Sequence, residues 1–224
     1  MTLVYDLFWR PLAAYEIIRG GGYPSVSNSY GRFHVGDIRA VLQFSPFFEP
    51  KVKDIVSGAK GLFVDVGANI GLMSVLAARN GAEVIAIEPA GATYSLLVEN
   101  IEANGMKGRI ETVRAAAWAN SEDLLLEYND QLALRRIGTE GETVKGVGLD
   151  SLLQGRIPSL IKVDVEGRTP EVLHGARETL RVHRPRIVFE ARPELDELPP
   201  VETALSPFGY SIKRLDRTNW LALA

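Results

Sequence analysis

The 224-residue chain contains no cysteine. Disulfide bonds, thiolate nucleophiles and cysteine-bound zinc are therefore excluded. Histidine is scarce as well, and the three copies, His34, His174 and His183, show no spacing typical of a metal site. We therefore predict no metal centre.

The sequence also lacks a long apolar run. The segment Met1–Trp9 is apolar, but Asp6 interrupts it and Arg10 and Pro11 follow. It is too short and too charged for a membrane span or a signal peptide. We expect an amphipathic helix that packs on the domain, with a position on a membrane surface as the alternative. The chain is accordingly predicted to be cytoplasmic and to have no membrane span.

An excess of positive charge is missing too. The chain has 25 Lys and Arg against 28 Asp and Glu, for a formal net charge of −3. This balance weighs against a broad nucleic-acid surface, although a local basic patch stays open. Hydrophobic residues make up 46% of the chain. Together with the length, this indicates one α/β domain with a sizeable core and a short extension, and it leaves the oligomeric state undetermined.

The stretch Phe63–Gly71 (FVDVGANIG) is the most informative part of the sequence. The apolar run 62–66 is interrupted only by Asp65, as in a buried parallel strand that ends at a site. A tight turn follows, and the apolar segment 72–78 predicts a helix. A ligand can lie against the exposed N–H groups of such a turn. The predicted contacts from this stretch are Asp65, Gly67, Ala68, Asn69 and Gly71.

The glycine spacing separates two classes of cofactor. A dinucleotide site would need G-x-G-x-x-G, whereas Gly67 and Gly71 form G-x-x-x-G with Asp65 two residues before the first glycine. A carboxylate at this place is unfavourable for pyrophosphate but suits a cationic or amine-bearing ligand, such as the methionine part of S-adenosylmethionine. A P-loop is excluded because no G-K-[ST] follows.

A second strand, 82–87, ends at Glu88 and Pro89, and Glu88 lies 23 residues after Asp65. An acid at this distance, at the end of the second strand, typically binds ribose hydroxyls. A carboxylate can accept two hydrogen bonds from a vicinal diol. We therefore predict that Glu88 binds the ribose of the cofactor.

These motifs, DVGANIG and IEP, are followed by Leu160–Gly167 (LIKVDVEG). Together they resemble the FkbM family of S-adenosylmethionine-dependent methyltransferases, over about residues 63–190. The resemblance implies a Rossmann-like class I methyltransferase fold, that is, a doubly wound, mostly parallel sheet. It also implies S-adenosylmethionine as the cofactor and a hydroxyl of a sugar, glycolipid or secondary metabolite as the acceptor.

Around this centre, residues 1–60 are predicted to form a helix and hairpin extension, a lid or substrate platform, and residues 61–224 the methyltransferase domain. In the extension we expect a helical segment over 2–18, a linker over 22–28, a hairpin of 31–35 with 39–44 and a helix over 51–58. In the domain we expect a helix over 91–104, strands over 109–114, 123–128 and 143–149, and a polar loop over 129–141, with a solvated hairpin as the alternative for this loop. Asp150 is expected to cap its own segment. Further expectations are strands over 159–163 and 186–190, a helix over 169–181, a helix over 194–205 broken by Pro199-Pro200, and a closing antiparallel pair, 210–215 with 219–223.

Two further segments are predicted to contact the cofactor. Small residues at 115–117 let a flat base approach the backbone, so Ala117 is assigned to the site. Trp118 either stacks on the base or, as we prefer, packs elsewhere. The aromatic, Pro-bounded segment Phe44–Glu49 lies just before the first strand, so Glu49 is placed at the cofactor's entrance, with a packing connector as the alternative.

Asp164 and Glu166 are the predicted catalytic residues. Asp164 closes a strand at the same sheet edge as Asp65 and Glu88, so it can orient the acceptor hydroxyl or accept its proton. Glu166 follows in the turn as the second candidate. The family's usual run is D-V-E-G-x-E, whereas this chain has Thr169 at the last position with Arg168 beside it. That departure favours an acceptor with an anionic group.

Two alternatives remain open. A small-molecule or glycan acceptor is preferred, but the segment 44–49 faintly resembles one in tRNA guanine-N1 methyltransferases. An RNA methyltransferase is less favoured, because that family has N-P-P-type residues where this chain has DVEG. The other alternative is a catalytically silent module that binds S-adenosylmethionine.

Overall fold

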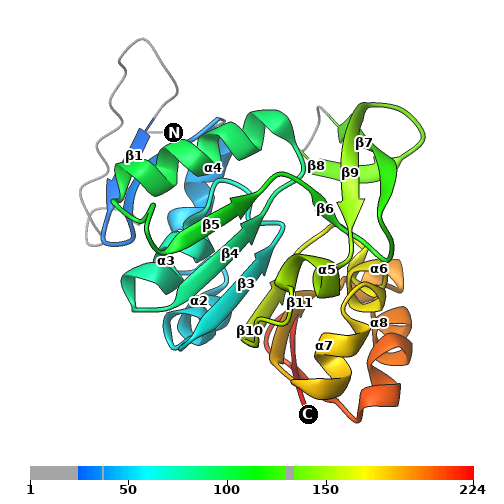
Figure 1. Cartoon of the computed structure of the whole chain (residues 1–224). Coiled ribbons are helices and arrows are strands. Elements are labelled where there is room, and N and C mark those ends of the chain that lie inside the picture. The colour runs from blue at the N-terminus through cyan, green and yellow to red at the C-terminus, as the bar shows by residue number, and fades with distance from the viewer. Residues whose placement is uncertain (1–24, 37, 130–133) are drawn as a thin grey trace.

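The structure is a computed structural model that describes residues 25–36, 38–129 and 134–224. Its central feature is a seven-stranded sheet with the order β12-β13-β11-β10-β3-β4-β5 (Figure 1). Five of these strands are parallel: β3 (Leu62–Val66), β4 (Glu83–Ile87), β5 (Ile110–Val113), β10 (Pro158–Val163) and β11 (Arg186–Glu190). The predicted C-terminal pair is present as β12 (Ser211–Arg214) and β13 (Asn219–Leu223), with β13 antiparallel to β11. The predicted helix over 2–18 lies outside the described residues.

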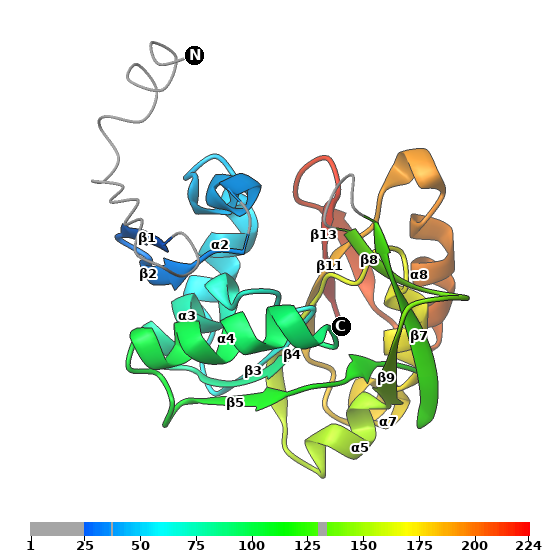
Figure 2. The ribbon, with the colours of Figure 1, turned by 90° about the horizontal axis from the view of Figure 1, so that it is seen from above.

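Helices cover both faces of this sheet, as Figure 2 shows from above. One face carries α2 (Pro50–Ser57), α3 (Leu72–Arg79) and α4 (Gly91–Ala103), and the other carries α5 (Leu149–Leu153), α6 (Thr169–His174), α7 (Arg177–Val182) and α8 (Leu198–Leu205). Successive residues of a strand alternate between the two faces of the sheet. Because helices cover both faces, the strands are apolar on both sides. Phe63 joins the core of the first face, whereas Val64 and Val66 join that of the second. The predicted doubly wound, mostly parallel sheet is therefore confirmed.

A second sheet projects from the end of the first. It has the order β6-β9-β7-β8 and consists of β6 (Ala116–Ala117), β7 (Glu122–Asn129), β8 (Leu134–Gly138) and β9 (Glu142–Val147). For 134–138 the predicted polar loop is wrong and the alternative, a hairpin, is confirmed, because this segment pairs antiparallel with β7. Backbone hydrogen bonds hold an edge strand in register without an apolar pattern, so composition did not show it.

The predicted hairpin of 31–35 with 39–44 is wrong. The strands that pair are β1 (Ser25–Asn28) and β2 (Gly31–His34), and the following segment is a 3-10 helix, η1 (Ile38–Phe44). The Asn28 side chain accepts a hydrogen bond from the N–H of Tyr30 and so fixes the turn between the strands. Val41 and Phe44, three residues apart, are both buried, which is the helical rather than the strand period.

The described part of the N-terminal extension packs on the main sheet. Val26, Phe33 and Phe44 share one apolar core with Phe63 of β3. The Phe33 and Phe44 rings lie 4.9 Å apart. The division into an extension and a domain stays a prediction, but the residues from 25 onward contribute to the core that supports α3 and α4.

The predicted helix over 169–181 is interrupted at Gly175-Ala176, between α6 and α7. A Cβ atom on Gly175 would lie 2.0 Å from the carbonyl oxygen of Trp118, so only glycine fits where these two backbones meet. The prediction that Asp150 caps its own helix is wrong. Asp150 instead caps the N-terminus of α7, where its carboxylate accepts hydrogen bonds from the N–H groups of Glu178 and Thr179 at 2.9 Å.

Near the C-terminus, the predicted helix over 194–205 is divided before its prolines rather than at them. The pieces are a 3-10 turn, η2 (Pro193–Leu195), and α8, followed by η3 (Ser206–Phe208). Pro199 and Pro200 lie in the first turn of α8, where a missing N–H costs no helical hydrogen bond.

None of the helices in the described ranges is both long and apolar enough to cross a membrane.

Candidate active site

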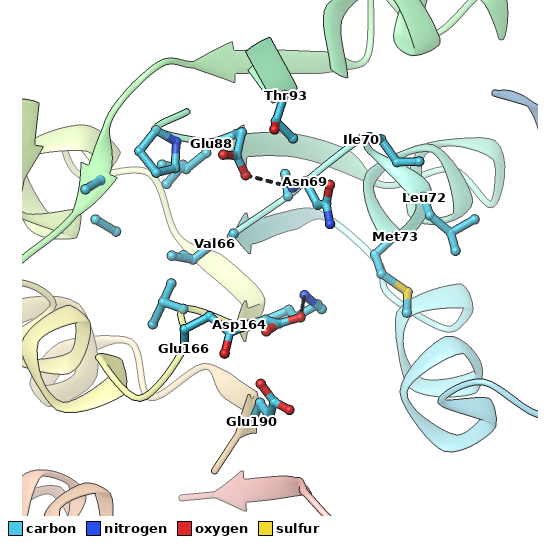
Figure 3. Close-up of a pocket in the computed structure, with 18 of the residues that line it drawn as sticks. Val66, Asn69, Ile70, Leu72, Met73, Glu88, Thr93, Asp164, Glu166 and Glu190 are labelled. Atoms are coloured by element: carbon cyan, nitrogen blue, oxygen red, sulfur yellow. Dashed lines mark hydrogen bonds and ion pairs between the residues drawn. The ribbon is translucent and has the colours of Figure 1, made fainter. Parts of the chain in front are cut away.

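A cavity of about 760 Å³ lies at the carboxyl ends of β3, β4, β10 and β11. The chain passes from β3 to β4 on one side and returns to β10 on the other side of β3, so this edge is the switch point of the strand order. Ligands of doubly wound sheets bind at such points. Figure 3 shows Glu88 and Asn69 on one side of this cavity and Asp164, Glu166 and Glu190 on the other.

The turn after β3 has the backbone that its glycines predict. Gly67 has φ 74°, and a Cβ atom there would lie 1.9 Å from the carbonyl oxygen of Asp164. The N–H groups of Gly67 and Ala68 both donate to the carbonyl of Ile87 at 3.0 Å, which ties the turn to the end of β4. Asn69 has the left-handed backbone that we predicted, with φ 52°.

Glu88 joins the two sequence motifs directly. Its buried carboxylate accepts a hydrogen bond from the N–H of Asn69 at 3.0 Å and another from the N–H of Ala90 at 3.0 Å (Figure 3). The same side chain lines the cavity. The structure therefore fixes this carboxylate at the cavity wall, where a ligand's hydroxyl groups could reach it.

Most of the predicted cofactor residues line this one cavity, namely Glu49, Gly67, Ala68, Asn69, Glu88 and Ala117. Asp65 and Gly71 do not line it. Gly71 is the N-cap of α3, with φ 92°, and Asp65 is fully buried. Direct contact of these two residues with a cofactor stays a prediction.

Asp65 instead organises the floor of the cavity. Its carboxylate accepts a hydrogen bond from the Ser74 hydroxyl at 2.6 Å and pairs with the Lys162 ammonium at 3.7 Å. Lys162, in β10, is itself buried and also lies 3.2 Å from Asp164. Burial raises the pKa of Asp65, while Lys162 and Ser74 oppose the shift. The sequence did not predict this bridging role for Lys162.

The two predicted catalytic carboxylates both line the cavity, but different partners hold them. Asp164 directly follows β10 and pairs with Lys162. Glu166 has a left-handed backbone, φ 50°, and its carboxylate pairs with Arg192 at 3.0 Å. Burial raises the pKa of Glu166, and Arg192 acts against the shift. An ion pair thus anchors Glu166 at the cavity wall.

Glu190 is a carboxylate of the cavity that the sequence analysis missed. It is the last residue of β11, beside Asp164. Burial and the neighbouring carboxylate of Asp164 raise the pKa of Glu190 to about 8. The signal was available, because a predicted strand ending in Glu at the same sheet edge meets the criterion that identified Glu88.

Glu49 brings the N-terminal extension to the cavity. It precedes α2 with a left-handed backbone, φ 47°, and its carboxylate accepts a hydrogen bond from the Asn219 side chain at 3.4 Å. Burial raises the pKa of Glu49, opposed by Lys162. The neighbouring Phe48 also lines the cavity, while Phe47 is 78% exposed. The predicted position near an entrance is consistent with this placement, and a role in cofactor binding stays a prediction.

The second sheet supplies another wall, through Trp118, Leu126 and Ile137. Arg168 connects this wall to α6, because its guanidinium pairs with Glu171 at 3.1 Å, donates to the carbonyl of Ile137 at 3.3 Å and lies 5.9 Å from the centre of the Trp118 ring. Arg168 also lines the cavity, so the expected contact of its guanidinium with an anionic group of the acceptor stays a prediction.

Thr169, which replaces the acid typical of the family, does not line the cavity. It is 1% exposed, and its hydroxyl donates to the carbonyl of Glu190 at 3.3 Å. The threonine therefore supports the backbone beneath the cavity.

Acidic side chains outnumber basic ones around this cavity. Among the residues that the structure describes, five carboxyl groups line it, those of Glu49, Glu88, Asp164, Glu166 and Glu190, against the cations Lys162 and Arg168. Such a wall favours a cationic ligand over an anionic one. Among the described residues, no group of three or more acidic or histidine side chains is arranged to hold a metal ion.

Comparison with known proteins identifies the family of this architecture. Residues 65–212 match the model of the methyltransferase FkbM domain. The chain is 26% identical to methyltransferase sdnD of Sordaria araneosa over 229 residues, covering 84% of this chain and 88% of the relative. It is 33% identical to the hexuronic acid methyltransferase AglP of Haloferax volcanii over 123 residues, covering 52% of this chain and 50% of the relative.

Solved structures agree in fold. A methyltransferase FkbM from Methylobacillus flagellatus KT superimposes with a TM-score of 0.52 at 22% identity, covering 75% of this chain and 44% of that protein. An S-adenosylmethionine-dependent methyltransferase from Agrobacterium tumefaciens superimposes with a TM-score of 0.53 at 13% identity, covering 92% and 70%. At these identities the likeness shows the fold alone.

Proposed function

The chain belongs to the FkbM methyltransferase family, and we propose that it transfers a methyl group from S-adenosylmethionine to a hydroxyl of a sugar, glycolipid or secondary metabolite. One observation carries the proposal. The turn joined by Glu88 and Asn69, and the carboxylate of Asp164, form opposite sides of one cavity at the switch point of the sheet. A cofactor held on the first side would face a proton acceptor on the second.

The residues present fit S-adenosylmethionine. Glu88 is fixed at the wall by two backbone N–H groups and would accept the ribose hydroxyls. Small residues at Ala115–Ala117 leave room for a flat base. The surplus of carboxylates suits the positive charge of a sulfonium and an ammonium group. When bound, the cofactor supplies an electrophilic methyl group.

Asp164 has the proposed catalytic role. It lies at the end of a buried strand and is oriented by Lys162 at 3.2 Å. Its carboxylate would orient the acceptor hydroxyl and accept its proton, which strengthens the oxygen as a nucleophile. Glu166, held by Arg192, would contact another part of the acceptor.

The acceptor class rests on the family and on the named relatives. One of these is a hexuronic acid methyltransferase, which makes a sugar the first class to test. We favour a hydroxyl over a carboxylate as the reacting group, because the described residues place five carboxyl groups around the cavity. A hydroxyl group avoids this repulsion.

The experiment is methyl transfer from cofactor labelled in its methyl group to carbohydrate, lipid and RNA fractions, with the heat-denatured protein as the control. Label in carbohydrate or glycolipid supports the proposal. Label in RNA alone would replace it with the RNA methyltransferase alternative. Tight cofactor binding without transfer to any fraction would favour the silent module.

A further inference from the structure

Two carboxyl groups of the cavity lie side by side at the ends of neighbouring strands. Val163 of β10 is paired with Phe189 of β11, and the next residue of each strand is an acid, Asp164 and Glu190. Both side chains line the cavity, on the side opposite Glu88 (Figure 3). Two carboxylates that share one site repel each other when both are ionised, so a proton on one of them is favoured.

The two members of the pair have different neighbours. The ammonium of Lys162 lies 3.2 Å from Asp164. Within the described part of the chain Glu190 forms no ion pair, since the nearby Arg192, which acts against the rise of its pKa, pairs with Glu166 at 3.0 Å and with Glu197 at 2.9 Å.

Three further carboxylates influence the charges around the pair. The carboxylates of Glu49 and Asp65 lie near the Lys162 ammonium and raise its pKa. The carboxylate of Glu166 lies near Glu190 and raises the pKa of Glu190. Burial and the Asp164 carboxylate raise the pKa of Glu190 to about 8. At neutral pH the Glu190 carboxyl group is therefore the protonated member of the pair.

We propose that Asp164 and Glu190 act as one unit that releases its proton when a sulfonium cation binds beside it and takes a proton back from the acceptor hydroxyl during transfer. The inference rests on the proposed function. It assigns Glu190 a catalytic role, and it makes the pair rather than Asp164 alone the proton acceptor.

The charges and atoms of the step balance. The acceptor oxygen forms a bond to the methyl carbon, the carbon–sulfur bond breaks with its electron pair remaining on sulfur, and the hydroxyl proton moves to the pair. The sulfur loses one positive charge while the pair gains one proton. The net charge of the cavity is therefore the same before and after, so the walls of the cavity need not reorganise.

The pair should consequently distinguish two ligands of nearly the same shape. S-adenosylmethionine carries a positive sulfur next to the pair and lowers its affinity for the proton. S-adenosylhomocysteine has a neutral sulfur and leaves the proton in place. The difference in proton release between the two ligands is a direct measure of the pair.

The test is calorimetric titration of each ligand at pH 7 in two buffers with different ionisation enthalpies, which gives the number of protons released per ligand bound. We expect close to one proton for S-adenosylmethionine and none for S-adenosylhomocysteine. In Glu190→Gln both ligands should still bind, and the difference between them should vanish. The matched control is Glu194→Gln, an exposed carboxylate outside the cavity, which should keep the difference.

Asp164→Asn provides a second variant in case Glu190→Gln does not fold, and it should also lose the difference. Equal proton release for the two ligands in the wild-type protein, or an unchanged difference in Glu190→Gln, would overturn the inference while leaving the methyltransferase proposal intact. Failure of both ligands to bind the folded protein would overturn the proposed function and, with it, the role of the pair.

Discussion

The Glu88 carboxylate accepts a hydrogen bond at 3.0 Å from the backbone N–H of Asn69, 19 residues earlier in the chain. The acid at the end of β4 and the turn after β3 are therefore one structural unit. Asn69 presents its N–H because its backbone is left-handed, φ 52°. A change at Glu88 thus affects both its own contact with a ligand and the shape of the turn.

Glu88→Ala should weaken binding of S-adenosylmethionine by roughly 1–3 kcal/mol, the scale of lost hydrogen bonds to a charged group. Titration calorimetry measures the change. Glu83→Ala, on the exposed opposite end of β4, is the control and should bind normally. Unchanged affinity in Glu88→Ala would rule out the ribose role.

Glu49→Ala tests the N-terminal extension. The side chain lines the cavity and faces Lys162, so its loss should weaken cofactor binding while unfolding stays cooperative. Asp54→Ala, exposed on α2, is the matched control. If Glu49→Ala bound the cofactor with full affinity, the segment 44–49 would be only a connector.

Asp164→Asn and Glu166→Gln should separate in steady-state kinetics once an acceptor is known. Asp164→Asn should lose most of kcat with cofactor affinity nearly intact, since misplacing a catalytic group by about 1 Å can cost on the order of 100-fold. Glu166→Gln should chiefly raise the acceptor's KM, as loss of a binding contact does. A dead Glu166→Gln beside an active Asp164→Asn would reverse the two roles, and activity in both would show that neither side chain is the base.

Lys162→Met should destabilise the fold by about 3–5 kcal/mol, because it leaves the fully buried carboxylate of Asp65 without its cation. Denaturant unfolding measures the loss. Adding Asp65→Asn to Lys162→Met removes the orphaned charge and should restore much of the stability. Lys213→Met, exposed on β12, serves as the control. No gain in the double variant would show that the pair does not account for the loss.

Glu190 should also make stability depend on pH. Its pKa is raised from 4.5 to about 8, so between these values the folded protein holds a proton that the unfolded chain has released. The free energy of unfolding should therefore fall as pH rises through this interval and level off above about 8. Glu190→Gln should flatten the fall, whereas Glu83→Gln should not. Parallel pH profiles for the wild type and Glu190→Gln would contradict the raised pKa.

The sequence by itself determined the two strands and the turn that form one side of the cavity, because the signals for these elements are local. A buried strand, a turn that needs Gly67, and a strand that ends in Glu88 are each specified within about ten residues, by apolar runs and by backbone conformations that few residues tolerate. The same local patterns gave the order of strands and helices, and hence the doubly wound sheet.

Only the tertiary structure decided which side chains meet. Asp150 caps α7 rather than its own helix, Gly175 permits contact with the backbone of Trp118, and β8 completes a second sheet with little apolar pattern of its own. The pairing of Asp164 with Glu190 depends likewise on β10 lying next to β11. Such contacts join residues that are distant in the chain, and their energies depend on burial and on neighbouring charges. Those quantities exist only once the chain has folded.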